Sequence, residues 1–147
     1  MNINTTGFSG RNLRKNISVY TNDAKNPKLS LKIRGRVEKV VTITPEEIRL
    51  TGFPDQQLEG KVAIIPEDKY PFKIVNFKAR SGRSISFKLT LKKSKGKPYY
   101  LLTVKNLRKK KGRYSDTIYL ETDSKVRSKI RINIHGDIFE KDQKGEI

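Results

Sequence analysis

A pattern of apolar residues occurs twice in the chain, at a constant offset of 101 residues and without a gap. In each copy, apolar residues occupy every second position on both sides of a polar break. This alternation predicts two antiparallel strands that bury one face and are joined by a turn. The matched pairs are Ile17/Ile118, Val19/Leu120, Thr21/Thr122, Leu29/Ile130, Leu31/Ile132, Ile33/Ile134, Gly35/Gly136 and Val37/Ile138. The same β-hairpin is therefore predicted twice, and Gly35 predicts a bend or bulge near its end.

The spacing of the two copies predicts the architecture. About a hundred residues is the length of one immunoglobulin-like β-sandwich, and only the second copy has that much chain before it, since sixteen residues precede the first. We therefore expect an all-β chain with a complete immunoglobulin-like β-sandwich over residues 38–140. Residues 1–37 are expected to be a lead-in and an orphan β-hairpin, the closing hairpin of a truncated preceding repeat. Residues 141–147 are expected to form a disordered charged tail.

Short alternating runs bounded by turn residues predict the strands of the sandwich. The predicted strands are residues 40–43, 47–50, 60–65, 72–77, 84–92, 98–105, 117–122 and 129–138. The clearest hairpin joins the fifth and sixth of these strands through residues 94–97. The alternation also predicts which side chains point into the core: Phe87, Leu89, Leu102, Val104, Ile118, Leu120, Ile132 and Ile134.

Composition excludes several classes of protein. The chain has no cysteine, so it has neither a disulfide framework nor a thiolate metal site. No apolar stretch is long enough to span a membrane. The first ten residues lack the basic and apolar segments of a secretory signal. Any signal segment would therefore lie upstream of this chain.

The polar residues suggest no catalytic constellation. His135 is the only histidine, and a solvent-facing strand position is its simplest interpretation, although a pocket that held it beside a buried carboxylate would favour an enzyme. The adjacent pairs Glu46/Glu47 and Glu67/Asp68 fall in turns, whereas paired catalytic acids come from separate elements. We predict no catalytic residue and no cofactor.

Two polar turns could supply oxygen ligands to calcium. They are Asn22-Asp23 and Thr122-Asp123-Ser124. Both lack the spacing of a loop with five or more oxygen ligands, and Asn and Asp are common hairpin-turn residues. We therefore interpret both segments as turns and predict no metal site.

Positive charge is concentrated in one window. The chain has a formal net charge of +18, and sixteen Lys or Arg lie between Asp68 and Asp116 with no Asp or Glu among them. A dense basic segment attracts phosphate, sulfate or anionic lipid, but it is also a common solubilising feature. The candidate polyanion-binding residues are Lys92, Lys93, Lys95, Lys97, Lys105, Arg108, Lys109, Lys110, Lys111 and Arg113. Residues 92–97 are predicted to form a hairpin tip and residues 105–113 a loop before the next strand. The candidates could therefore form two separate patches or, if the loop folds back, a single band.

Residues 19–37, VYTNDAKNPKLSLKIRGRV, resemble a large bacterial family of envelope and secreted proteins of unknown function. The modules of that family are immunoglobulin-like, distantly similar to HYDIN/ASPM and PapD-like sandwiches, and they end in a Thr-Asn-Asp-x-x-x-Pro hairpin with a Gly-x-Val exit. The first copy matches throughout. The second keeps Thr122, Asp123 and Gly136 but has no matching Pro. The resemblance implies a cell-envelope, periplasmic or secreted location and carries no activity.

Together these features predict a non-enzymatic structural or interaction module. The alternative function is polyanion binding, with nucleic acid, a sulfated glycan or anionic lipid as the ligand. The partners considered are another protein or a neighbouring immunoglobulin-like repeat, a polyanion, or a second copy of this chain that dimerises through the N-terminal hairpin.

Overall fold

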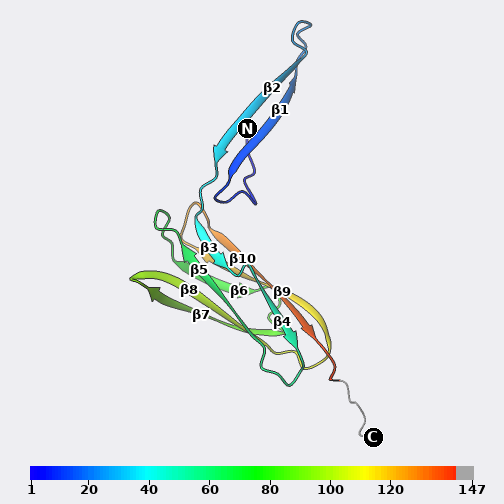
Figure 1. Ribbon diagram of the computed structural model, residues 1–147, viewed down its shortest axis with the longest axis vertical. Coiled ribbons are helices and arrows are strands. Elements are labelled where there is room, and N and C mark those ends of the chain that lie inside the picture. The colour runs from blue at the N-terminus through cyan, green and yellow to red at the C-terminus, as the bar shows by residue number, and fades with distance from the viewer. Residues whose placement is uncertain (142–147) are drawn as a thin grey trace. The chain divides into compact units, whose positions relative to one another are not determined.

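The computed structural model describes residues 1–141, which form ten β-strands and no helix (Figure 1). The strands are β1 (Asn12–Tyr20), β2 (Lys28–Arg36), β3 (Val41–Thr44), β4 (Glu47–Gly52), β5 (Glu59–Pro66), β6 (Ile74–Ala79), β7 (Ile85–Ser94), β8 (Lys97–Asn106), β9 (Gly112–Thr122) and β10 (Lys129–Ile138). The chain divides into two compact units, Met1–Val40 and Val41–Ile147. The predicted tail lies outside the described residues except for Lys141.

The second unit is a β-sandwich of two four-stranded sheets. One sheet has the order β4-β10-β9-β6 and the other the order β3-β5-β8-β7. All pairings are antiparallel except that of β4 with β10. The chain passes from one sheet to the other between β3 and β4, where the Thr44–Pro45 peptide is cis. All eight strands predicted for this unit are present.

β9 begins at Gly112, five residues before its predicted start. Its added residues pair in continuous register with the end of β10, so that Tyr114 lies opposite Gly136. Residues 112–116 show little apolar alternation, so the sequence pattern did not predict this part of β9. The segment predicted as a loop over residues 105–113 is consequently shorter, and only residues 107–111 lie between β8 and β9.

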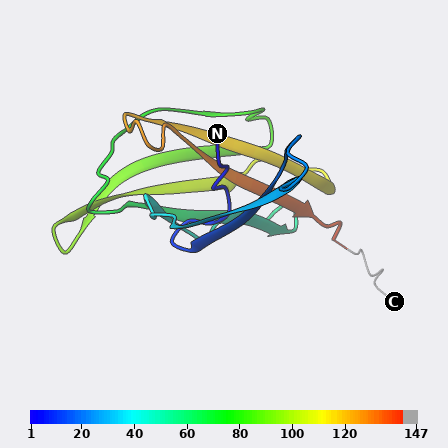
Figure 2. The same ribbon diagram turned by 90° about the horizontal axis from the view of Figure 1, so that it is seen from above.

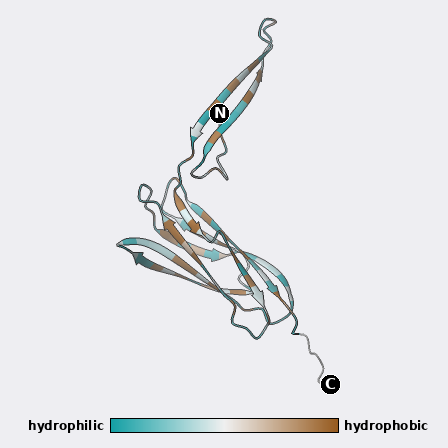
Figure 3. Ribbon diagram, viewed as in Figure 1, coloured by the Kyte–Doolittle hydropathy of each residue, from teal (hydrophilic) through white to brown (hydrophobic). Residues whose placement is uncertain are grey.

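The predicted core orientation is confirmed. Six of the eight side chains predicted to point inward are fully buried, namely Leu102, Val104, Ile118, Leu120, Ile132 and Ile134. The other two, Phe87 and Leu89, are half-buried against the same core because β7 is the last strand of its sheet. Figure 3 shows the alternation of apolar and polar residues along these strands.

The first unit consists of β1 and β2 with the turns that precede them. The register pairs Ile17 with Leu31 and Val19 with Leu29. At the offset of 101 residues, Ile118 pairs with Ile132 and Leu120 with Ile130. The sequence repeat is therefore also a repeat of strand register.

The turns of the two hairpins share one hydrogen-bond pattern, centred on a threonine. The Thr21 N–H donates to the Pro27 carbonyl, and the Thr122 N–H donates to the Ser128 carbonyl, both at 2.9 Å. Each threonine hydroxyl donates to the carbonyl five residues later. Each also accepts the N–H two residues later, at 3.3 Å in the first hairpin and 3.2 Å in the second. Ser128 occupies the position of Pro27 in the second hairpin. Only the backbone carbonyl of this residue takes part in the hydrogen bonds, so the second turn forms without a proline.

The first hairpin differs from its copy in the exposure of its apolar residues. The residues that match the buried Leu120, Ile130 and Ile132 are exposed: Val19 is 36%, Leu29 44% and Leu31 50% accessible. β2 continues in regular register through Gly35 to Arg36, as β10 does through Gly136 to Ile138, so the bulge predicted at Gly35 does not form.

Candidate functional site

The ten candidate polyanion-binding residues fall into two separate groups. One group surrounds the β7–β8 turn and the other lies at and beyond the end of β8. The ten residues of β8 separate them, which corresponds to about 30 Å of extended strand. In Figures 1 and 2 the β7–β8 turn projects from one end of the sandwich, away from the end where β10 finishes. The ten residues therefore form two separate patches and not a single band.

The turn group, Lys92, Lys93, Lys95 and Lys97, is built on a tight hairpin. Lys95 and Gly96 are its only loop residues, with φ of 50° and 79°. Positive φ at both positions is typical of a two-residue type I′ turn. Asp68 pairs with Lys97 at 2.7 Å and raises the pKa of that ammonium group. Within residues 1–141 the other three lysines have no carboxylate partner.

The second group is organised by Asn106 at the end of β8. The Asn106 Oδ1 accepts the Tyr114 hydroxyl at 2.7 Å and the Arg108 N–H at 3.2 Å. The Arg108 guanidinium folds back onto its own loop and donates from Nε to the Lys110 carbonyl at 3.1 Å. It also donates from Nη2 to the Lys111 carbonyl at 3.4 Å. Arg108 therefore supports the loop, and two of its five guanidinium N–H donors bond to the loop carbonyls.

Three more members of this group form exposed ion pairs. Lys105 lies 3.7 Å from Glu59, Arg113 lies 3.2 Å from Asp137, and Lys111 pairs with Glu140. Such pairs contribute little to stability, but they reduce the charge available to a ligand. In the described part of the chain, five of the ten candidates keep an ammonium group without an acidic partner: Lys92, Lys93, Lys95, Lys109 and Lys110.

An open hollow of about 800 Å³ lies beside the second group. Its lining comes from the β4–β5 connection, the β8–β9 loop and the segment after β10: Pro54, Asp55, Lys109, Lys110, Lys111, Glu140 and Lys141. A hydrogen bond from Lys141, 3.2 Å away, lowers the pKa of Asp55. The hollow mixes both signs of charge, so only Lys109 and Lys110 offer uncompensated positive charge to an anion. Sequence reasoning missed the other four positions because they are distant from the loop in the chain.

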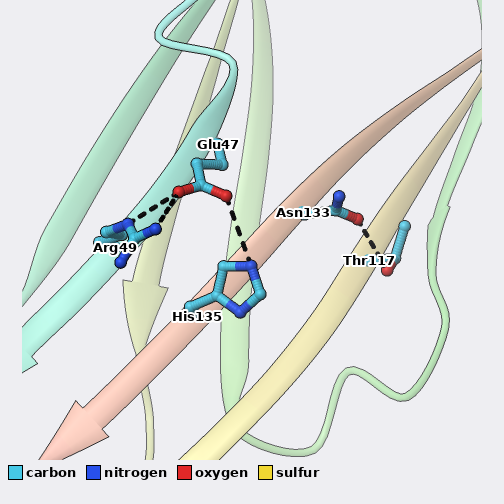
Figure 4. Close-up of polar contacts among 5 residues, drawn as sticks. All are labelled: Glu47, Arg49, Thr117, Asn133 and His135. Atoms are coloured by element: carbon cyan, nitrogen blue, oxygen red, sulfur yellow. Dashed lines mark hydrogen bonds and ion pairs between the residues drawn. The ribbon is translucent and has the colours of Figure 1, made fainter.

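His135 lies on the outer face of the sheet, on β10, beside two residues of β4 (Figure 4). Its Nε2 is 3.5 Å from the Glu47 Oε2, and the Arg49 Nε donates to the Glu47 Oε1 at 2.7 Å. The side chains of His135 and Glu47 are 49% and 39% exposed. The carboxylate beside His135 is thus solvated, and it already binds an arginine. This geometry lacks the buried carboxylate that would favour an enzyme.

Asp116 is a buried carboxylate that the sequence did not single out. Its oxygens accept the N–H groups of Gly82 at 2.8 Å, Ser81 at 3.1 Å and Thr117 at 2.8 Å. Burial alone would raise the pKa of Asp116, but these hydrogen bonds and the charge of Arg80 outweigh it and lower that pKa. Because backbone N–H groups occupy both oxygens, Asp116 anchors the β6–β7 connection.

The two polar segments that could supply calcium ligands, Asn22-Asp23 and Thr122-Asp123-Ser124, form turns. Asp23 accepts the Lys25 N–H at 2.9 Å, and Asp123 accepts the Lys73 N–H at 2.7 Å. Within residues 1–141 no group of three or more His, Cys, Asp or Glu side chains is placed to hold a metal ion. In the same range, no helix is long and apolar enough to cross a membrane.

No protein-family model matches the chain, and no curated protein is similar to it in sequence. Among solved structures, the chain is similar to the crystal structure of a protein of unknown function from Porphyromonas gingivalis W83, with a TM-score of 0.52 and 8% sequence identity. The match covers 87% of this chain and 65% of that protein. At this identity the likeness concerns the fold alone, and it supports the β-sandwich.

Proposed function

We propose that this chain is a non-enzymatic structural and interaction part of a bacterial cell-envelope or secreted protein built from immunoglobulin-like repeats. One observation carries the proposal: two hairpins 101 residues apart share strand register and turn hydrogen bonds. A duplicated unit of this size is typical of proteins made of tandem modules.

The strand order supports an immunoglobulin-like module. In that fold, strands A, B, E and D form one sheet and strands C, F and G the other. The order β3-β5-β8-β7 corresponds to A-B-E-D, and β10-β9-β6 corresponds to G-F-C. β4 then corresponds to a second segment of strand A that joins strand G in parallel.

The first hairpin fits the closing hairpin of a preceding repeat. Its counterpart β9–β10 lies between β4 and β6 and buries its apolar face against the opposite sheet. Since an isolated two-stranded hairpin is marginal in water, the exposed Val19, Leu29 and Leu31 indicate a surface that such a sheet would cover. Strands of a preceding repeat would provide this cover.

The envelope or secreted location rests on the family resemblance of residues 19–37. Cell fractionation tests it, with an epitope inserted between Lys95 and Gly96, where the turn is exposed. We expect the tagged protein in the envelope fraction or in the medium. Recovery in the cytosol would contradict the proposed location. The non-enzymatic role predicts in addition that a His135→Ala variant keeps the phenotype of the parent protein, because His135 is the only histidine and would not be catalytic.

Polyanion binding is the alternative function, and the five unpaired lysines favour it. Replacing Lys109 and Lys110 with Gln should lower the salt concentration that elutes the protein from heparin, because fewer counterions are released on binding. Lys97→Gln combined with Lys105→Gln is the matched control, since it removes the same charge from ion-paired positions. Equal elution of both variants and the parent protein would show that these charges only solubilise the protein.

A further inference from the structure

One flank of the sandwich has open strand edges in both sheets. β6 ends one sheet and β7 ends the other, and neither has a second neighbour among the described strands. The two edges meet through Phe77 and Phe87, whose ring centroids are 6.0 Å apart at 74°. Unpaired N–H and C=O groups on such an edge can pair with a strand of another chain.

Large apolar side chains are exposed along this flank. Val75 is 64%, Phe77 45% and Leu91 57% accessible. Val75 follows Ile74, which packs against the core, and lies where the register of β6 with β9 shifts. Phe77 and Leu91 point toward the inner side of their sheets, since they pair with Leu120 and Tyr100. An apolar group of this kind is a typical binding surface when polar residues surround it.

The rim of the flank is uniformly basic. Seven Lys or Arg and no acidic residue occur between residues 73 and 93: Lys73, Lys78, Arg80, Arg83, Lys88, Lys92 and Lys93. None of them forms an ion pair with Asp or Glu in residues 1–141. The carboxylate of Glu121, on the neighbouring strand β9, accepts a hydrogen bond from the Asn76 side-chain amide at 3.4 Å and pairs with none of these seven residues.

We infer that this flank binds an extended acidic segment of a partner protein, which adds to the edge of β7 as a further strand. β7 is the better edge because its ten residues pair with β8 without interruption, whereas β6 has six residues and a register shift. The inference names the partner class for the proposed interaction role and rests on that role.

The alternation of β7 defines the segment. Phe87, Leu89 and Leu91 face the inner side, and Lys88 and Lys92 face outward. On an added strand, apolar residues at every second position would extend the inner side over Phe77 and Leu91. The acidic residues between them would lie beside Lys88 and Lys92, where opposite charges on neighbouring strands attract.

Charge also argues against a second copy of this chain as the partner. The hairpin β1–β2 has an exposed apolar face, but its strands carry Lys and Arg and no acidic residue. Like charges across strands repel. Lysines on an edge strand can also serve only to prevent aggregation, and the following experiment separates that role from binding.

The probe is a ten-residue peptide in which Glu alternates with Val or Ile, labelled for fluorescence anisotropy. The two comparison peptides carry Lys in place of Glu, or Glu at all ten positions. We expect the alternating acidic peptide to bind with a dissociation constant at least about tenfold below that of either comparison, because only it provides both charge and apolar contacts. Amide exchange should show new protection in β7.

Three double variants locate the site. Phe77→Ser with Leu91→Ser should weaken binding at least about tenfold, since the two exposed apolar side chains that the added strand would cover are lost. Lys88→Glu with Lys92→Glu should make the Lys peptide the better ligand. Lys109→Glu with Lys110→Glu, at the other patch, should change little.

Equal binding of the all-Glu peptide would mean attraction by charge alone and would overturn the inference. So would the absence of saturable binding, or protection that appears outside β7. None of these results bears on the repeat architecture or on cellular location, so the proposed function would remain.

Discussion

Replacing Gly136 with Ala should destabilise the sandwich through one side chain. An added Cβ would lie 2.0 Å from the Tyr114 Cε1 and 2.2 Å from its Cζ. The ring has to move, and it is held by the hydrogen bond from its hydroxyl to Asn106. Overpacking costs about 1–3 kcal/mol, and a lost hydrogen bond about 1 kcal/mol. The entropic gain of Gly→Ala offsets about 0.4–1 kcal/mol. The net loss should be about 1–3.5 kcal/mol.

Urea denaturation followed by circular dichroism measures this loss, and the sequence repeat supplies its control. Gly35 occupies the same position in the first hairpin, and nothing lies within 4 Å of its Cβ position. Gly35→Ala should therefore be neutral or slightly stabilising. In a Tyr114→Ser background, Gly136→Ala should cost almost nothing because the obstructing ring is gone. A loss below about 0.5 kcal/mol in the parent protein would refute the reasoning, since surface substitutions of no consequence fall in that range.

Further predictions concern the core, the anchored loop and the turn. Leu102→Ala should lower the free energy of unfolding by about 2–5 kcal/mol in urea denaturation, since its side chain is fully buried, whereas Lys88→Ala should change it little; equal effects would contradict the orientation of these strands. Asp116→Asn should lower the free energy of unfolding by about 1–3 kcal/mol at neutral pH. The substitution replaces one carboxylate oxygen, which accepts a backbone N–H, with an NH₂ group that faces that N–H. The lowered pKa of Asp116 stabilises the fold above the unfolded-state value of about 3.9, and this contribution is lost as the pH falls through the lower folded-state value. Acid denaturation curves should therefore be flatter for Asp116→Asn. Thr122→Val should lower the melting temperature because it removes the hydroxyl that bonds to Arg127 and Ser124; an unchanged value would show that the hydroxyl is dispensable.

The strands and the core could be predicted because a period of two in apolar residues depends only on local sequence. Leu102 and Ile118 are buried for the reason that their alternation suggested. The start of β9 could not be predicted, because Tyr114 pairs with Gly136 across the hairpin, and the tolerance of a large ring there depends on the missing Cβ.

The candidate site shows a similar limit. Charge density identified the basic residues, but it could not show that Arg108 folds onto its own loop or that Lys111 pairs with Glu140. These contacts join residues from loops that are distant in sequence. The open edge of β7 was also hidden, because strand order follows from the whole sandwich and not from the local pattern of residues 85–94.

The most direct test of the repeat is to transplant one hairpin into the place of the other. Residues 17–37 replace residues 118–138, and the unfolding free energy of the chimera is measured in urea. The offset of 101 residues preserves Ile at positions 118 and 134 and changes the other buried apolar residues only among Val, Leu and Ile.

Such substitutions cost up to about 1.5 kcal/mol each, so we predict cooperative unfolding with a total loss of about 2–5 kcal/mol. A control graft of residues 16–36, shifted by one position, places polar residues in the core and should not fold. If the in-register chimera also fails to fold cooperatively, the two hairpins are not interchangeable closing units, and the proposed repeat architecture is wrong.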